Sequence, residues 1–369
     1  MKLILQIKLL PTEVQTISLL NTIKKYNKAC NEISHIAWQN KEFNQYRLHQ
    51  LVYYKIKEKF NLTAQIVIRC LCKVAYAYKA GKHQERRFKL LGAITYDSRI
   101  LSYRKNSVSI WSIDGRLRIP IACHNPEYFS HIKGEADLIT RKGKFFLFQT
   151  VDIPEEDIKD VEGFIGIDFG IVNLAVTSDN DVFSGKGTEK VRKRATSFKR
   201  KLQKCSSKSA KRHLIKYSGK ERRFKKHINH VISKQIVNNA LKTRRAIALE
   251  DLKGFSPTVR KAQRETFGKW AFYELRKFIE YKAKLVGIPV VCINPRYTSQ
   301  ACSICGYISK SNRKSQSIFS CLSCGKTLNA DLNAAINIAG LADRKPAILN
   351  LSPFSMLNRS SSGTESPAF

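Results

Sequence analysis

The chain has 369 residues, enough for two or three domains with hydrophobic cores. Its hydrophobic content of 43% excludes an intrinsically disordered protein, and 66 Lys and Arg against 29 Asp and Glu give a net charge of +37. So large an excess predicts a polyanionic partner, with nucleic acid ahead of a membrane surface. The sequence shows no signal peptide and no transmembrane segment, so we interpret its ten cysteines as reduced thiols, with metal binding where they cluster.

The first ninety residues begin as a strand and continue as helices. Apolar residues alternate at positions 3, 5, 7 and 9, which is typical of a half-buried strand. Thr12 and Gln15 have capping-box spacing, and apolar residues then recur at helical intervals. Cys70 and Cys72 have no nearby cysteine pair, so we interpret them as core thiols.

From about residue 91 to 155 the hydrophobic period changes to two. Asp114-Gly115 and Lys142-Gly143 mark hairpin turns between alternating segments. We expect a small β module here. The opening strand is expected to belong to this module, with the helices as an insertion.

A third region begins at Gly163 with an apolar run that ends at Asp168. Further short strands are expected at 174–176, after the turn at 179–181, at 246–250 and at 289–293. A helix is expected from about residue 268 to 286, with Gly287 as its C-terminal cap. Cys292 lies inside the last strand and is interpreted as a core thiol.

Residues 186–245 form the most basic stretch, with 22 Lys and Arg and only two acidic residues, Glu189 and Glu221. Because aromatic residues are sparse here, contact with a phosphate backbone is favoured over base stacking. The alternative is a solvated basic face without a partner. A long helix is expected from about Glu221 into the strand at 246–250.

Four cysteines predict a metal site. Cys302-x-x-Cys305 and Cys321-x-x-Cys324 are separated by 15 residues. Two such pairs form tight knuckles whose four thiolates close a tetrahedral Zn²⁺ site. Four thiolates leave no open coordination position, so the zinc is expected to be structural.

Three acidic residues are candidates for a second metal site: Asp168 and Glu250 each end an apolar run, and Asp331 opens a helix of small residues. If the fold brings them together, they make an oxygen-lined site suited to Mg²⁺. Each also has a plain alternative: Asp168 as a turn residue, Glu250 as a surface residue at a strand end, and Asp331 as a charge that compensates the helix dipole.

The order of these motifs resembles the TnpB (OrfB-type) family of insertion-sequence proteins, relatives of the compact type V CRISPR effectors. The resemblance covers about residues 161–342 strongly and residues 1–160 only in layout. The matching motifs are Gly166-Ile-Asp168-x-Gly170-x-x-Asn173, Leu249-Glu250-Asp251-Leu252, Tyr297-Thr-Ser-Gln-x-Cys302-Ser-x-Cys305 and Asp331-x-Asn333-Ala-Ala-x-Asn337.

This resemblance implies an α/β fold. An RNase-H-like (RuvC-type) nuclease domain over 161–296 and 330–343 would hold an inserted zinc module at 297–329, which binds target nucleic acid. A wedge-like β-barrel would comprise 1–10 and 91–160, with a helical recognition lobe at 11–90 and a flexible tail at 344–369.

The resemblance also implies an activity, RNA-guided cleavage of DNA beside a short flanking motif. Asp168, Glu250 and Asp331 would be catalytic and hold two Mg²⁺ ions that straddle the scissile phosphate. The guide RNA would come from the element's own transcript and the target would be double-stranded DNA. We expect a monomer in the cytoplasm of a prokaryote, associated with the nucleoid and not with a membrane.

Three other functions remain open. A basic zinc protein could bind nucleic acid, guided or not, without cutting, but the intact acidic triad counts against it. A transposase that cuts and joins element ends could use the same metal chemistry, and only the resemblance separates the two. An adaptive CRISPR effector is the third, and the compact length fits the transposon relative better.

Overall fold

The structure is a computed structural model that describes residues 1–205, 207–251 and 272–344. The chain divides into two compact units, Met1–Pro154 and Glu155–Phe369. The tail expected over 344–369 lies, apart from its first residue, outside the described residues, as does the start of the helix expected from residue 268. Where helices are described, none has both the length and the apolar character that a bilayer crossing needs.

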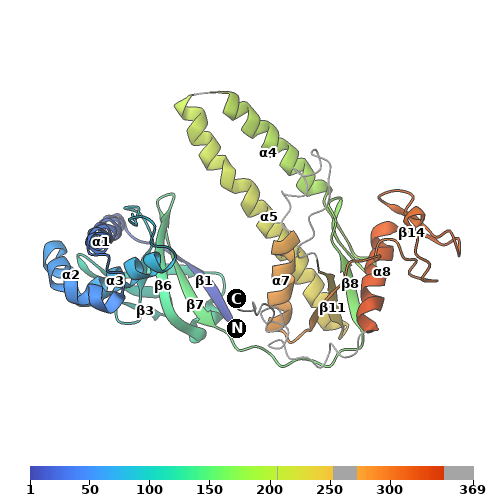
Figure 1. Cartoon of the computed structure of the whole chain (residues 1–369), viewed down its shortest axis with the longest axis horizontal. Helices are drawn as coiled ribbons and strands as arrows, with labels where there is room; N and C mark the ends of the chain where they lie inside the picture. Colours follow the sequence, from blue (N-terminus) through green and yellow to red (C-terminus); the bar gives the residue numbers. More distant parts are fainter. Residues whose placement is uncertain (206, 252–271, 345–369) are drawn as a thin grey trace, which may run out of the picture. The chain divides into compact units, whose positions relative to one another are not determined.

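An antiparallel seven-stranded sheet makes up much of the first unit (Figure 1). Its strands and one 3-10 turn are β1 (Lys2–Leu9), β2 (Ile94–Tyr96), β3 (Leu101–Arg104), β4 (Ser107–Ser112), β5 (Gly115–Cys123), η1 (Pro126–His131), β6 (Ile132–Arg141) and β7 (Lys144–Asp152). β1 pairs with both β5 and β7, which confirms that the opening strand joins the later β segment. The edge strands β2 and β3 are joined by only residues 97–100, so the sheet curls and nearly closes into a barrel.

Three helices separate β1 from the rest of this sheet: α1 (Glu13–Gln39), α2 (Gln45–Phe60) and α3 (Ala64–Lys79). The predicted capping box starts α1, because the backbone N–H of Gln15 donates to Thr12 and the backbone N–H of Thr12 donates to the Gln15 side chain. Cys70 is fully buried, as predicted, whereas Cys72 is only half-buried.

The second unit is built on a mixed five-stranded sheet with the order β10-β9-β8-β11-β12. The strands are β8 (Phe164–Asp168), β9 (Asn173–Thr177), β10 (Val182–Ser184), β11 (Ala246–Glu250) and β12 (Val290–Ile293), which confirms the predicted strands. The first three are antiparallel neighbours, and β11 runs parallel to both β8 and β12. The carboxyl ends of β8 and β11 therefore lie side by side.

Helices cover both faces of this sheet (Figure 1). Ile165, Ile167 and Leu249 point to one face and pack against α5 (Lys208–Lys242) and α7 (Phe272–Leu285). Ala246 and Ala248 point to the other face and pack against α8 (Ala330–Asp343). Burial on both faces explains why these strands read as continuous apolar runs instead of alternating ones.

The basic stretch forms a helical hairpin of α4 (Lys186–Lys204) and α5, which begins 13 residues before the predicted start at Glu221. Gly219 lowers the helix propensity of this part of the sequence, and like charges four residues apart, such as Arg212 and Lys216, destabilise an isolated helix. Contacts with α4 stabilise it instead, because the rings of Phe198 and Tyr217 lie 4.7 Å apart and Lys199 Nζ lies 2.5 Å from a Glu221 oxygen.

Strand β12 corrects the interpretation of Cys292, which is exposed and not a core thiol. β12 is the edge strand, and its alternate residues Val291 and Ile293 face the core. The thiol of Cys292 instead accepts a hydrogen bond from Arg276 at 3.0 Å. Gly287 has φ +69°, the left-handed conformation predicted for the residue that ends α7.

Gly166 sets the close approach of β8 to α8. A Cβ at this position would overlap the carbonyl oxygen of Ala335 and lie 2.5 Å from the amide nitrogen of Ala339. Gly166→Ala is therefore expected to lower the free energy of unfolding by about 1–3 kcal/mol or more, measured by urea denaturation. Gly187→Ala is the matched control, since nothing lies near its Cβ, and equal losses in both variants would contradict this packing account.

Candidate active site and metal centre

Three elements bring the predicted acidic residues to one end of the sheet in the second unit. Asp168 is the last residue of β8, and Glu250 is the last residue of the parallel neighbour β11. Asp331 lies in the first turn of α8, where the side chain of Asn329 caps the helix. The parallel pairing of β8 with β11 and the packing of α8 on their surface thus assemble residues that are far apart in sequence.

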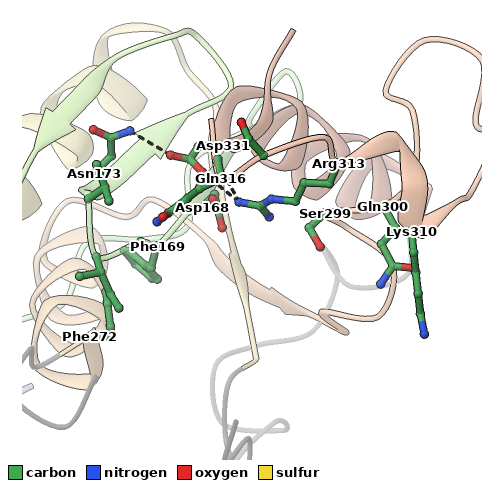
Figure 2. Close-up of a pocket in the computed structure, with 14 residues that line it drawn as sticks. Asp168, Phe169, Asn173, Phe272, Ser299, Gln300, Lys310, Arg313, Gln316 and Asp331 are labelled. Carbon is green, nitrogen blue, oxygen red and sulfur yellow. Dashed lines mark hydrogen bonds and ion pairs between the residues drawn. The ribbon is translucent and has the colours of Figure 1, made fainter. Parts of the chain in front are cut away.

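Asp168 and Asp331 line an open cavity of about 770 Å³ (Figure 2). Asn173, Ser299, Lys310 and other polar residues also line it, together with the rings of Phe169 and Phe272. Glu250 does not line this cavity. A cavity lined by carboxylates together with the cationic side chains of Lys310 and Arg313 suits a phosphate ester better than an apolar ligand.

Burial and neighbouring groups affect the ionisation of Asp168 and Glu250. Burial raises the pKa of Asp168 well above its usual range, and the nearby negative charges of Glu250 and Asp331 raise it further. Burial also raises the pKa of Glu250, although a hydrogen bond from Thr298 at 2.6 Å opposes this effect. A bound divalent cation would stabilise buried carboxylates that repel one another, so the charge of this cluster is compatible with the predicted Mg²⁺.

Asp331 has two partners that the sequence reasoning did not assign to the site. The side-chain amide of Asn173 donates to Asp331 Oδ2 at 2.9 Å, and Arg313 Nη2 lies 3.5 Å from Oδ1, as the dashed lines in Figure 2 show. Asn173 belongs to the same sequence motif as Asp168, and this motif could have indicated that Asn173 lies near the acidic residues. Arg313 lies in the spacer between the cysteine pairs, where no pattern distinguishes it from other basic residues.

The three carboxylates come near one another but do not form a compact ligand set. Among the residues that the structure describes, only the four cysteines form a group of three or more metal-ligating side chains close enough to hold one ion. Glu250 is held by Thr298, and Asp331 is held by Asn173 and Arg313. These neutral and cationic partners reduce the repulsion between the carboxylates.

The structure brings the four predicted cysteines together in one cluster that could hold a metal ion. The four sulfur atoms all lie within 4.8 Å of one another, with Cys302 and Cys324 at 3.7 Å and Cys305 and Cys321 at 3.5 Å. Four ligands at the zinc–sulfur bond length would lie about 3.8 Å apart in a tetrahedron. Zinc therefore fits this geometry.

Two short strands and tight turns build the knuckles around the cysteines. They are β13 (Ile318–Ser320) and β14 (Thr327–Asn329), preceded by the 3-10 turn η2 (Lys310–Asn312). Gly306 and Gly325 follow the second cysteine of each pair with φ of +75° and +70°. Glycine is the residue that adopts this conformation without strain.

Helix α8 connects the cysteine module with the carboxylate cluster. The buried Asn333 accepts from the backbone N–H of Ser303 and donates to the carbonyl of Ala301. Asn337 donates to the carbonyls of Ala301 and Thr298, the residue whose hydroxyl holds Glu250. Folding of the cysteine module is therefore coupled to the positions of Glu250 on β11 and Asp331 on α8.

The raised pKa of Asp168 predicts how the stability of the folded protein depends on pH when divalent metal is removed. A carboxyl whose pKa is raised by folding binds its proton more tightly in the folded state than in the unfolded one, so the free energy of unfolding falls as the pH rises from about 4 through the folded pKa. Asp168→Asn removes this titration. It is expected to raise the melting temperature at pH 7 in EDTA and to lose this advantage near pH 4; an advantage independent of pH would contradict the burial of a charge at this position.

Comparison with known proteins places this geometry in a family. Residues 148–254 match the OrfB_IS605 family model, described as "Probable transposase", and residues 272–338 match the Cas12f1-like TNB domain. The chain is 31% identical over 229 residues to the TnpB-like protein MJ0751 of Methanocaldococcus jannaschii, a match over 58% of this chain and 70% of that protein. The chain belongs to the TnpB family.

The chain matches a smaller share of its relatives outside the TnpB proteins than of MJ0751. The chain is 34% identical over 202 residues to the CRISPR-associated endodeoxyribonuclease Cas12f1 of Syntrophomonas palmitatica, which covers 50% of this chain and 40% of that protein. The chain spans half or less of the length of the Cas12f1 proteins from Syntrophomonas palmitatica and Sulfoacidibacillus thermotolerans. The fold is similar to the Cas12f1 chain solved in complex with sgRNA and target DNA, with a TM-score of 0.58 at 17% identity over 89% of this chain and 83% of that one.

Proposed function

We propose that this TnpB-family protein is an RNA-guided, Mg²⁺-dependent DNA endonuclease of a transposable element. The observation that carries the proposal is the meeting of Asp168, Glu250 and Asp331 at one end of the second unit's sheet. The relatives named as endodeoxyribonucleases and the match to a Cas12f1 fold support it. No candidate catalytic position is substituted, which argues against a descendant that binds nucleic acid without cutting.

The sheet of the second unit supports an RNase-H-like, RuvC-type nuclease domain. Three antiparallel strands are followed by two parallel ones, and the candidate acids lie on the two central parallel neighbours and on the helix that covers them. In this proposal 161–296 and 330–343 form the nuclease domain and 297–329 the zinc module. Residues 1–10 and 91–160 form the wedge-like barrel, and 11–90 the recognition lobe.

Asp168, Glu250 and Asp331 would hold two Mg²⁺ ions. When bound, the ions supply activation of water and stabilisation of the leaving oxygen of a phosphodiester. Asn173 and Thr298 orient two of the carboxylates through hydrogen bonds. Arg313 lines the same cavity and pairs with Asp331, and its guanidinium would be able to contact a non-bridging phosphate oxygen there.

The hairpin of α4 and α5 gives the second unit a long basic surface. Residues 186–245 contain 22 Lys and Arg, and most of the side chains on the hairpin are exposed. A surface of this kind binds the phosphate backbone of a guide–target heteroduplex by charge and shape, while base pairing supplies the sequence specificity. Four thiolates would hold one structural Zn²⁺ in the module that follows.

Sequencing of RNA that co-purifies with the protein tests the guided part of this proposal. The protein is expressed together with its native flanking DNA, and a single RNA species from the end of the element is expected to be retained at high salt. A transposase that acts on element ends needs no such RNA. Purification of an active nuclease with no bound RNA would favour that alternative.

A further inference from the structure

A groove in the first unit has the character of a binding site that the proposed nuclease chemistry does not use. It lies between α2 and α3 and has a volume of about 600 Å³, within the range of small-molecule sites. We call it the tyrosine groove. Phe43, Tyr46, His49, Tyr76 and Lys79 line it.

The aromatic rings of the tyrosine groove are unusually open to solvent. Tyr46 is 71% exposed and Tyr76 is 64% exposed, although each carries a large apolar ring. The ring of Phe43 packs against the buried ring of Tyr78, with the two ring centres 4.4 Å apart. The ring of His49 stacks on Tyr53 at 4.5 Å. Open rings on a well-packed support form a platform on which a flat ligand can stack.

The surroundings of the tyrosine groove are strongly basic. Between Lys41 and Lys82 the chain holds nine Lys and Arg but only two Glu. Lys79 Nζ lies 5.0 Å from the centre of the Tyr76 ring, and Lys82 Nζ lies 5.4 Å from the centre of the Phe43 ring. Lys79 and Lys82 thus place ammonium groups beside the Tyr76 and Phe43 rings, where they can pair with a phosphate next to a stacked base.

We propose that the tyrosine groove binds an unpaired, unstacked base of single-stranded RNA. Stacking on tyrosine and histidine rings, with lysines on the adjoining phosphates, is the combination by which proteins hold splayed bases in RNA loops and ends. Duplex DNA does not fit, because its base faces are covered by their neighbours. The inference rests on the proposed function only in taking RNA as a partner of the protein.

RNA is favoured over a protein partner and over single-stranded DNA. A protein segment that covered this groove would need acidic side chains to match the charge, and its apolar contact would be limited to the few open rings. Gln45 and His49 line the groove with donors and acceptors that a ribose 2′-hydroxyl can satisfy, whereas deoxyribose lacks this group.

Photo-crosslinking of the full chain to a short RNA that carries 5-iodouridine locates the bound base directly. We expect mass spectrometry to find adducts on Tyr46 or Tyr76, and the matching DNA strand to give weaker adducts there. Adducts only outside the tyrosine groove would overturn the proposal, and equal adducts with DNA would overturn the choice of RNA. Neither result depends on cleavage, so failure here is separate from failure of the nuclease proposal.

Affinity measurements test whether stacking supplies the binding. Tyr46→Ala or Tyr76→Ala should weaken binding of the RNA about 5- to 150-fold at fixed salt, by fluorescence anisotropy, because stacking of one base contributes this much. Tyr76→Phe should retain the affinity. Tyr54→Ala is the matched control, since Tyr54 is 79% exposed on the same helix but does not line the groove.

An abasic RNA strand shows whether the groove binds the base or only the phosphate backbone. The alanine variants should bind the strand without bases at the groove position as well as the unaltered protein does. An equal loss with the abasic strand would overturn the stacking role. A change in oligomeric state of the alanine variants, with RNA affinity unchanged, would assign the groove to a protein contact and also overturn the proposal.

Discussion

Asp168→Asn is expected to reduce DNA cleavage by about 1,000-fold or more while leaving guide RNA bound. The substitution keeps the shape of the side chain but removes one charge from the cluster that would hold the metal ions. A metal-bound transition state loses several kcal/mol when its ligand set is broken, and about 4 kcal/mol corresponds to a 1,000-fold loss in rate. Because Asp168 lines the cavity and interacts with the charges of both Glu250 and Asp331, its loss should be as severe as any in the site.

The measurement for this prediction is single-turnover cleavage of a labelled target in Mg²⁺. Asp343→Asn is the matched control, since Asp343 is an exposed aspartate at the other end of α8. It should cleave at the normal rate. Cleavage by Asp168→Asn within tenfold of the normal rate would mean that the three acids were wrongly assigned. Retained RNA in the inactive variant shows that the fold and the guide site are intact.

Removal of the four-cysteine metal is expected to have the second large effect. Binding of structural zinc supplies on the order of 10 kcal/mol to small metal domains, and the cysteine module has a core of only a few residues. Cys321→Ser together with Cys324→Ser should reduce zinc from one per chain to nearly none. Cleavage should fall at least about 100-fold, because Thr298 and Arg313 then lose their positions beside Glu250 and Asp331.

Zinc content is measured by atomic absorption and cleavage by the same single-turnover assay. Cys205→Ser is the matched control, because Cys205 is exposed at the end of α4 and lies outside the cysteine cluster. Normal cleavage by the zinc-free protein would contradict the connection through Asn333 and Asn337. It would make the cysteine module a separate binding unit rather than a support of the carboxylates.

Local patterns predicted the elements well where a residue's role depends on its near neighbours. The capping box at Thr12, the hairpin turn at Gly143 and the cap at Gly287 are all local backbone requirements, and the structure has each of them. The paired cysteines were also predictable, since the spacing alone brings the thiolates within reach of one ion. The meeting of the acids at one sheet end was expected only from the order of motifs in a family.

What depends on distant contacts was not predictable. The helix over 208–220 is stabilised by α4, so its own composition gave no signal for it. Cys292 is exposed because β12 is an edge strand, and strand order is not encoded in the local pattern. Arg313 reaches Asp331 only through the fold of the spacer between the cysteine pairs, and the tyrosine groove exists only when α2 and α3 are packed together.

Cleavage by a reprogrammed guide tests the central claim most directly. The protein is loaded with its co-purified RNA or with an RNA whose guide segment is replaced, and each is given plasmids with a randomised segment beside either target. We predict that the complex cuts only the plasmid that matches its guide, only in Mg²⁺ or Mn²⁺, and only beside a subset of the randomised sequences. Cutting that ignores the guide, or binding of both RNAs without cutting by the unaltered protein, would contradict RNA-guided nuclease activity at this carboxylate cluster.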